Sequence, residues 1–274
     1  IDVSSGAIVN ANANAQNWNG SFTFTGSNAL DLGTGAVQLN TSPVLTVSAG
    51  SLTVGGVIDD GASTFGLTKV GGGTLALNGA NTYGGVTTLS QGTLTFGGDN
   101  SAAGGGVTMA AGTLLNIAHN VAGTTKSLGA GPLTINGGTI DNTTAGALTA
   151  DNALTVGGSF AFTGTQGLTL SGENNLGTAV RTITVNGSTL ALTGGAWGVG
   201  GGITKAGSGS LTLAATNTFL GSTTVANGKL VIAGGANNRL PSAAELFIGS
   251  GATGGVLQLG NAGGATDQTV SSLS

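Results

Sequence analysis

The sequence contains no cysteine, so it can form neither a disulfide nor a thiolate metal site. Charged residues are also scarce, because six Lys plus Arg and ten Asp plus Glu among 274 residues give a formal net charge of −4. A protein without a cluster of cations has no electrostatic means of capturing nucleic acid or anionic lipid. We therefore expect no nucleic-acid partner.

Long apolar runs and helical periodicity are absent as well. No stretch approaches the length of a membrane span, residue 1 does not begin a signal peptide, and the Ala-rich segment 11–15 alternates with Asn. We expect no membrane insertion by this segment. Any signal or anchor would lie outside these residues.

Glycine, in contrast, is abundant, with 55 of the 274 residues. Aperiodic chains so rich in glycine are usually disordered, but here short apolar–polar–apolar triplets recur between the glycine-rich turns. This alternation predicts short β-strands with one buried and one solvated face. The triplets include Phe22–Phe24, Leu45–Val47, Leu52–Val54, Leu94–Phe96 and Leu133–Ile135.

One long stretch of the sequence occurs twice. Residues 66–98 read GLTKVGGGTLALNGANTYGGVTTLSQGTLTFGG, and residues 202–234 read GITKAGSGSLTLAATNTFLGSTTVANGKLVIAG. The two align without a gap, and 15 of their 33 positions are identical. A fixed internal repeat of this kind is typical of solenoids and arrays.

The repeated stretch resembles the autotransporter-associated β-strand repeat, also called the passenger-associated transport repeat. Both copies follow its pattern of G, a hydrophobic residue, T-K-x-G-x-G-T-L-x-L-x-G and, further on, N-T-Y-x-G. Among the departures of the second copy, Ala215 and Phe219 replace Gly79 and Tyr83. The resemblance implies a parallel β-solenoid on an exported bacterial surface protein. It implies no particular ligand and no catalytic site.

Weaker matches extend the repetition over the whole chain. We predict an all-β fold, a parallel and right-handed β-solenoid rod, in which residues 1–274 form one continuous solenoid of two homologous modules, 1–152 and 153–274. A solenoid turn cannot close its own core and must stack on its neighbours. Neither end of the chain shows a charged cap, and exposed strand edges invite stacking on another chain. The expected partners are therefore flanking repeats of a longer chain or other copies of this one, joined head to tail.

Few residues are candidates for chemistry. His119 is the only histidine and lacks a second His or Cys for a metal or nucleophile site, so we interpret it as a turn or surface residue. A glycosidase needs two carboxyl groups facing one cleft, but neighbouring strand residues point to opposite faces. Asp59-Asp60-Gly61 is instead typical of a turn. We predict no catalytic, cofactor-binding or metal-binding residues and no cofactor.

Two polar positions recur in both copies of the repeat: Lys69 matches Lys205, and Asn81 matches Asn217. They could form a periodic binding stripe. The interpretation that we favour makes each Asn the support of a turn or ladder through bonds to backbone groups, and each Lys a solvated side chain.

Trp18 and Trp197 are not repeat equivalents. Each could be an exposed platform for a sugar ring or a large residue packed within a turn of the solenoid, and we favour packing. The runs Gly71–Gly73 and Gly104–Gly106 lack the helix and lysine of a phosphate-binding loop, so we predict turns there.

These observations predict a structural protein, exported or on a bacterial cell surface, that serves as a stalk or fibre segment and is not an enzyme. The alternative is an adhesin-type module that binds a surface glycan or protein, for which an exposed tryptophan in a groove would be support. An enzyme acting on polysaccharide ranks third, because acid–base catalysis needs positioned ionisable side chains that this sequence scarcely contains.

Overall fold

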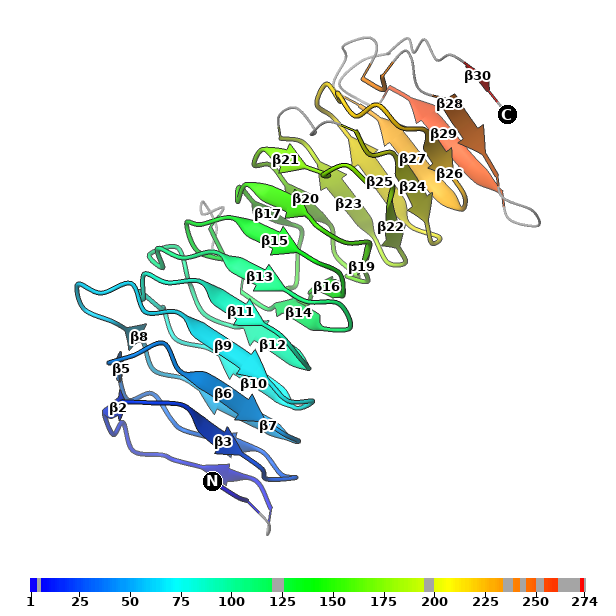
Figure 1. Ribbon diagram of the computed structural model, residues 1–274. Helices are drawn as coiled ribbons and strands as arrows, with labels where there is room; N and C mark the ends of the chain where they lie inside the picture. Colours follow the sequence, from blue (N-terminus) through cyan, green and yellow to red (C-terminus); the bar gives the residue numbers. More distant parts are fainter. Residues whose placement is uncertain are drawn as a thin grey trace. The chain divides into compact units, whose positions relative to one another are not determined.

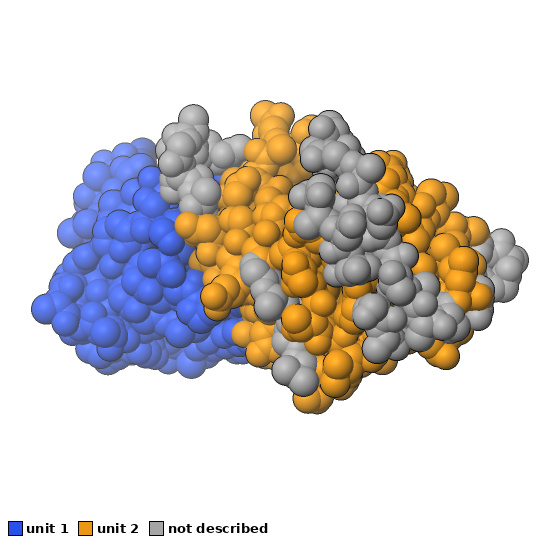
Figure 2. Space-filling view, turned by 90° about the horizontal axis from the view of Figure 1, so that it is seen from above, with its two compact units in different colours: residues 1–134 blue, residues 135–274 orange. Residues whose placement is uncertain are grey.

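The computed structural model of the chain describes residues 1–3, 6–119, 126–194, 200–233, 239–241, 245–249, 254–260 and 272–273. No helix occurs among these residues, and the strands pair in parallel, stacked as a β-solenoid. The predicted fold class is therefore confirmed. The chain divides into two compact units, residues 1–134 and 135–274, which Figure 2 shows in different colours. The modules predicted from self-similarity remain a prediction.

The strands of the first unit form three stacks (Figure 1). One stack is β1 (Ile8–Val9), β4 (Leu30–Asp31), β7 (Ser51–Val54), β10 (Thr74–Leu77), β12 (Thr93–Phe96) and β14 (Leu114–Ile117). A second is β3 (Phe22–Phe24), β6 (Val44–Val47), β9 (Leu67–Val70), β11 (Thr87–Leu89) and β13 (Val107–Met109), and a third is β2 (Gln16–Trp18), β5 (Val37–Leu39) and β8 (Ile58–Asp59). The boundary between the units falls within β15 (Leu133–Ile135).

The strands of the second unit stack in the same way. One stack is β16 (Thr139–Asn142), β19 (Phe160–Phe162), β22 (Arg181–Val185), β24 (Ile203–Ala206), β26 (Thr223–Val225), β28 (Glu245–Ile248) and β30 (Ser272–Leu273). Another is β17 (Leu148–Ala150), β20 (Leu168–Leu170), β23 (Thr189–Leu192), β25 (Ser210–Leu213), β27 (Gly228–Ile232) and β29 (Gly255–Leu259), and β18 (Leu154–Val156) pairs with β21 (Asn174–Asn175).

The register of these stacks places like residues above one another. Leu52, Leu75, Leu94 and Leu115 are successive partners, and all four side chains are fully buried. Partners lie 19 to 27 residues apart in the sequence, which is the length of one turn of the solenoid. The period-2 alternation of the sequence thus produces a continuous apolar column, because every second side chain of each strand points inward.

Glycine allows successive turns to lie close together at the corners between strands. A Cβ atom added to Gly56 would lie 1.8 Å from the carbonyl oxygen of Gly35, one turn earlier. Gly71 and Gly92 have φ angles of 81° and 71°, a conformation that side-chain-bearing residues rarely adopt. The predicted turn at Gly71–Gly73 is confirmed, and no phosphate-loop helix follows it.

Candidate functional site

The two repeated lysines are buried, so the prediction that they are solvated is wrong. Lys69 lies on β9 with a relative exposure of 0%, and its Nζ donates to the carbonyl oxygens of Val70 (3.0 Å), Gly71 (2.7 Å) and Gln91 (3.1 Å). The alternation of β9 places position 69 on the inner face. An ammonium group has three donors, and these match the carbonyls of two successive turns.

Lys205 on β24 repeats this arrangement in the second unit. Its side chain is 0% exposed, and its Nζ donates to the carbonyls of Ala206 (2.6 Å), Gly207 (2.6 Å) and Asn227 (3.1 Å). Each repeated lysine therefore joins the backbone of one turn to that of the next. The lysine at this position of the repeat holds successive turns of the solenoid together. Because both lysines are buried, they form no binding stripe on the surface.

Burial gives the folded protein an alkaline pH dependence. It lowers the pKa of Lys69 and of Lys205 to about 8, and it raises the pKa of Tyr83 to about 12 although Thr87 bonds its hydroxyl. From about pH 8 to about pH 10, Lys69 and Lys205 hold more protons in the unfolded chain than in the folded one, so the stability of the fold rises with pH. Above about pH 10, Tyr83 loses its proton more readily in the unfolded chain than in the folded one, so the stability falls.

We therefore expect the guanidinium midpoint of unfolding to be highest near pH 10. The double variant Lys69→Met, Lys205→Met should lose the rising limb, and Tyr83→Phe should lose the falling limb. A midpoint that falls steadily from pH 8 to pH 10 in the unaltered chain would contradict the effect of the lysines.

The repeated asparagines act as predicted, through hydrogen bonds that support the backbone. Asn81 is buried, its Oδ1 accepts from the backbone N–H of Ile58 (2.9 Å), and its Nδ2 donates to Oδ1 of Asn100 (2.8 Å). Asn100 in turn donates to the carbonyls of Gly98 (3.1 Å) and Ser127 (3.2 Å). In the second unit Asn217 donates to the carbonyls of Ala215 and Arg239. These side chains form an internal polar ladder that links consecutive turns.

Replacing Asn81 by alanine should lower the free energy of unfolding by about 1 to 3 kcal/mol, because it leaves a buried N–H and a buried amide oxygen without their partner. Chemical denaturation measures the loss. Asn78→Ala, at an exposed position three residues earlier, is the matched control and should change stability by no more than about 0.5 kcal/mol. Equal effects of the two substitutions would argue against the ladder.

The adjacent carboxylates form a turn, as the sequence predicts. Oδ1 of Asp59 accepts from the N–H of Gly61 (2.8 Å), and Oδ2 of the buried Asp60 accepts from the N–H groups of Phe65 (2.8 Å) and Gly84 (3.0 Å). Hydrogen bonds from Thr82 and Gly61 lower the pKa of Asp59 below its usual value. Both side chains accept hydrogen bonds from backbone N–H groups, and Asp59 also accepts from the hydroxyl of Thr82, so both are engaged in the local structure.

His119 is half-buried, and its charge contributes to lowering the pKa of Asp99, for which hydrogen bonds from Ser101 are the main cause. Ser101 bonds Asp99 directly, through its backbone N–H (2.9 Å) and through its side chain, so these three residues do not have the order of hydrogen bonds of a catalytic triad. No group of three or more His, Cys, Asp or Glu side chains in the described part of the chain could hold a metal ion. No described helix is long and apolar enough to span a membrane.

Trp18 is packed, as expected. It is 6% exposed, its ring meets that of Phe22 edge-on at 5.1 Å between centroids, and its Nε1 donates to Oε1 of Gln16 (3.2 Å). It therefore presents no platform for a sugar ring. Trp197 lies outside the described residues.

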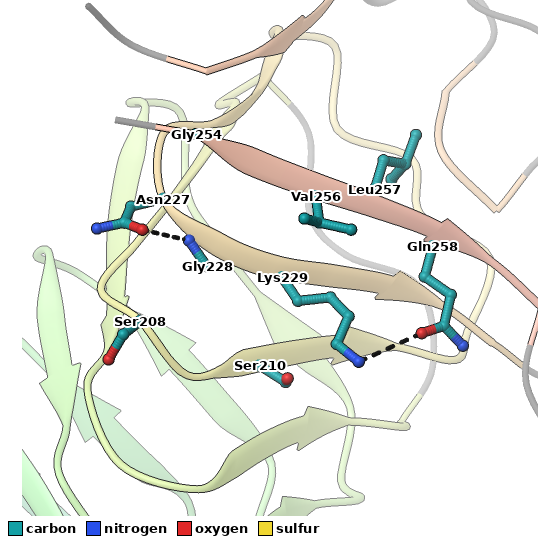
Figure 3. Close-up of a pocket in the computed structure, with 9 residues that line it drawn as sticks. All are labelled: Ser208, Ser210, Asn227, Gly228, Lys229, Gly254, Val256, Leu257 and Gln258. Carbon is teal, nitrogen blue, oxygen red and sulfur yellow. Dashed lines mark hydrogen bonds between the residues drawn. The ribbon is translucent and has the colours of Figure 1, made fainter. Parts of the chain in front are cut away.

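An open hollow of about 650 Å³ lies in the second unit over β25, β27 and β29 (Figure 3). Ser210, Lys229 and Val256 are register partners on these three strands and line it together. Nζ of Lys229 donates to Oε1 of Gln258 over 3.4 Å. At the neighbouring turn the N–H of Gly228 donates to Oδ1 of Asn227 over 2.6 Å.

The comparison with family models decides the classification. The model of the passenger-associated-transport-repeat matches residues 67–96, 91–115 and 203–232. The chain contains passenger-associated transport repeats. The first and third of these matches contain the buried lysines and the repeated asparagines Asn81 and Asn217, so the resemblance found in the sequence is confirmed on residues whose contacts are now defined.

About half of the chain is similar to a curated relative. The chain is 35% identical over 134 residues to a protein named "Adhesin BmaC autotransporter" from Brucella suis biovar 1 (strain 1330). The match covers 47% of this chain and 4% of that protein, so the chain spans only a small part of its relative. No solved structure matches the chain. The repeats and the relative confirm the expected location, an exported protein of the bacterial cell surface.

Sequence reasoning missed the hollow over the third matched repeat. The signal was present in the departures of one repeat from the other, because Lys229 stands where the first copy has Thr93, and Asn227 where it has Gln91. Where two copies of one fold carry different residues, the fold does not require either residue, so such positions are available for another role such as ligand binding. The absence of catalytic, cofactor-binding and metal-binding residues, which was inferred from the scarcity of ionisable side chains and from the lone His119, stays a prediction.

Proposed function

We propose that the chain is a stalk segment of a bacterial surface protein and that its function is mechanical rather than enzymatic. The observation that carries the proposal is the in-register stacking of Leu52, Leu75, Leu94 and Leu115, which gives four successive turns one buried column. A solenoid of this kind transmits load along its axis through inter-strand hydrogen bonds, and its length is set by the number of turns.

The way the ionisable residues are used supports a non-enzymatic role. The buried lysines bond backbone carbonyls, and the Asp59–Asp60 pair bonds backbone N–H groups and Thr82. Catalytic groups, in contrast, are held in clefts with an open side toward a substrate. Among the described residues these side chains serve the fold.

A second candidate function is adhesion, with a surface glycan or protein as the partner. It is favoured by the relative from Brucella suis, whose name calls it an adhesin. Head-to-tail assembly of this chain into filaments, with strand edges as the contact, is the remaining alternative.

Electron microscopy of the purified chain, combined with its mass in solution, separates these functions. A stalk segment should give particles with the mass of a single chain. When the repeat 66–98 is deleted, the parent protein should extend a shorter distance from the cell surface, and the binding of any ligand by the cells should be unchanged. Long uniform filaments would contradict the stalk proposal and favour head-to-tail assembly. Loss of binding to a surface glycan or protein without loss of reach would favour the adhesin.

A further inference from the structure

The hollow over β25, β27 and β29 has the composition of a ligand site. Its volume, about 650 Å³, lies within the range of small-molecule sites in proteins. Of the nine described residues that line it, Lys229 is the only charged one, and no carboxylate is among these nine. The hydrogen bond of its Nζ to Gln258 is long (3.4 Å) and goes to a neutral amide. A carboxylate reaching this ammonium would meet no negative charge from the lining.

The other lining groups suit the hydroxyls and the ring of a sugar. Ser208 and Ser210 each contribute a hydroxyl that can accept a hydrogen bond, and the hydroxyl of Ser208 itself donates to the carbonyl of Asn186 (3.4 Å). Because Oδ1 of Asn227 accepts from the N–H of Gly228, its Nδ2 is the group that points away from that turn, as Figure 3 shows. Val256 is 55% exposed and supplies an apolar surface for the C–H face of a ring.

The fold itself does not require these residues. In the first repeat Gly72, Gln91 and Thr93 stand in place of Ser208, Asn227 and Lys229. The strands there pair in the same way, since Thr74, Thr93 and Leu114 are register partners as Ser210, Lys229 and Val256 are. The second repeat therefore carries a cation and polar groups that the scaffold alone does not explain.

We propose that this hollow binds a carboxylate-bearing sugar, with Lys229 holding the carboxylate, Asn227 and the two serines bonding the hydroxyls, and Val256 packing on the ring. The site is open, so we expect an affinity in the millimolar range for one sugar chain, about 4 kcal/mol of binding free energy. Many copies on one cell surface would add avidity. The proposal goes beyond a stalk and does not depend on it.

The test is a titration of the chain with tetragalacturonate, in which binding is measured by NMR chemical-shift changes or by calorimetry. The neutral methyl ester of the same tetramer is the ligand control. Lys229→Thr is the matched variant, because threonine occupies the equivalent position of the first repeat. Lys126→Thr removes an equal charge outside the hollow and is the protein control. Thermal melting establishes that both variants are folded, and Lys229→Gln is a second variant if the first melts early.

We expect saturable binding of tetragalacturonate, at least about tenfold weaker binding by Lys229→Thr, and little change with Lys126→Thr. Raising the salt concentration should weaken binding of the acid and leave any binding of the ester unchanged. The proposal is overturned by no saturable binding at about 10 mM ligand, by equal binding of acid and ester, by an unchanged affinity of Lys229→Thr and Lys229→Gln, or by equal losses in the Lys229→Thr and Lys126→Thr variants. None of these results would bear on the stalk.

Discussion

Replacing Lys69 by alanine is expected to lower the free energy of unfolding by about 3 to 6 kcal/mol. The substitution removes the buried four-carbon stem of the side chain, and it takes the hydrogen-bond donor away from three carbonyl oxygens at once. Two of these carbonyls belong to the turn at Gly71 and the third to the following turn at Gln91, so both turns lose the same partner. Guanidinium denaturation followed by circular dichroism measures the change.

Two further substitutions separate the contributions of stem and charge. Lys69→Met keeps the apolar stem and removes the donors, and it should cost about half as much as Lys69→Ala. Lys229→Ala removes a lysine that is not buried from the other copy of the repeat, and it should change stability by about 0.5 kcal/mol or less. A Lys69→Ala variant as stable as the unaltered chain would show that water replaces the ammonium at no cost.

Replacing Leu75 by alanine is expected to cost about 2 to 5 kcal/mol. Leu75 is fully buried between its register partners Leu52 and Leu94, so the missing side-chain atoms leave a cavity within the apolar column. The backbone of a stacked strand is held by hydrogen bonds on both sides, and it cannot collapse far into that space. The same denaturation experiment applies.

The position of the loss is as informative as its size. Because each turn of a solenoid contacts mainly its neighbours, hydrogen exchange should accelerate most in β7, β10 and β12 and much less in β3 or β14. Leu75→Met, which conserves volume, should cost less than about 1.5 kcal/mol, and Ala76→Ser on the outer face of the same strand should be nearly neutral. Uniform acceleration of exchange in every strand would contradict nearest-neighbour cohesion.

The lysine and leucine predictions describe two kinds of cohesion that a stalk needs. The leucine column resists separation of turns through apolar contact. The lysines and asparagines add side-chain hydrogen bonds to the backbone near the corners between strands, where backbone groups of successive turns also bond one another. A protein of this construction gains reach by adding turns, each stabilised by the one before. The hollow around Lys229 lies on the outer face of the strands, so it does not lower the stability of the stacked turns.

The sequence by itself determined the class of fold. Alternating triplets such as Leu52–Val54 and Leu94–Phe96 define which side chains are buried, because the side-chain period of a strand is two. The repeat of residues 66–98 at 202–234 requires that each turn be stacked on a similar one. The turn at Asp59-Asp60-Gly61 and the backbone role of Asn81 were also predicted correctly, since both depend on hydrogen bonds to groups nearby or one turn away.

Only the tertiary structure decided where single polar side chains lie. The alternation pattern places Lys69 and Lys205 on the inner face, but charge argues for solvent; the choice depends on three carbonyls, one of them contributed by a turn 22 residues away. The hollow likewise depends on the register of β25, β27 and β29, which brings Ser210, Lys229 and Val256 together from three separate turns. Such contacts arise from stacking, and no local pattern in the sequence specifies them.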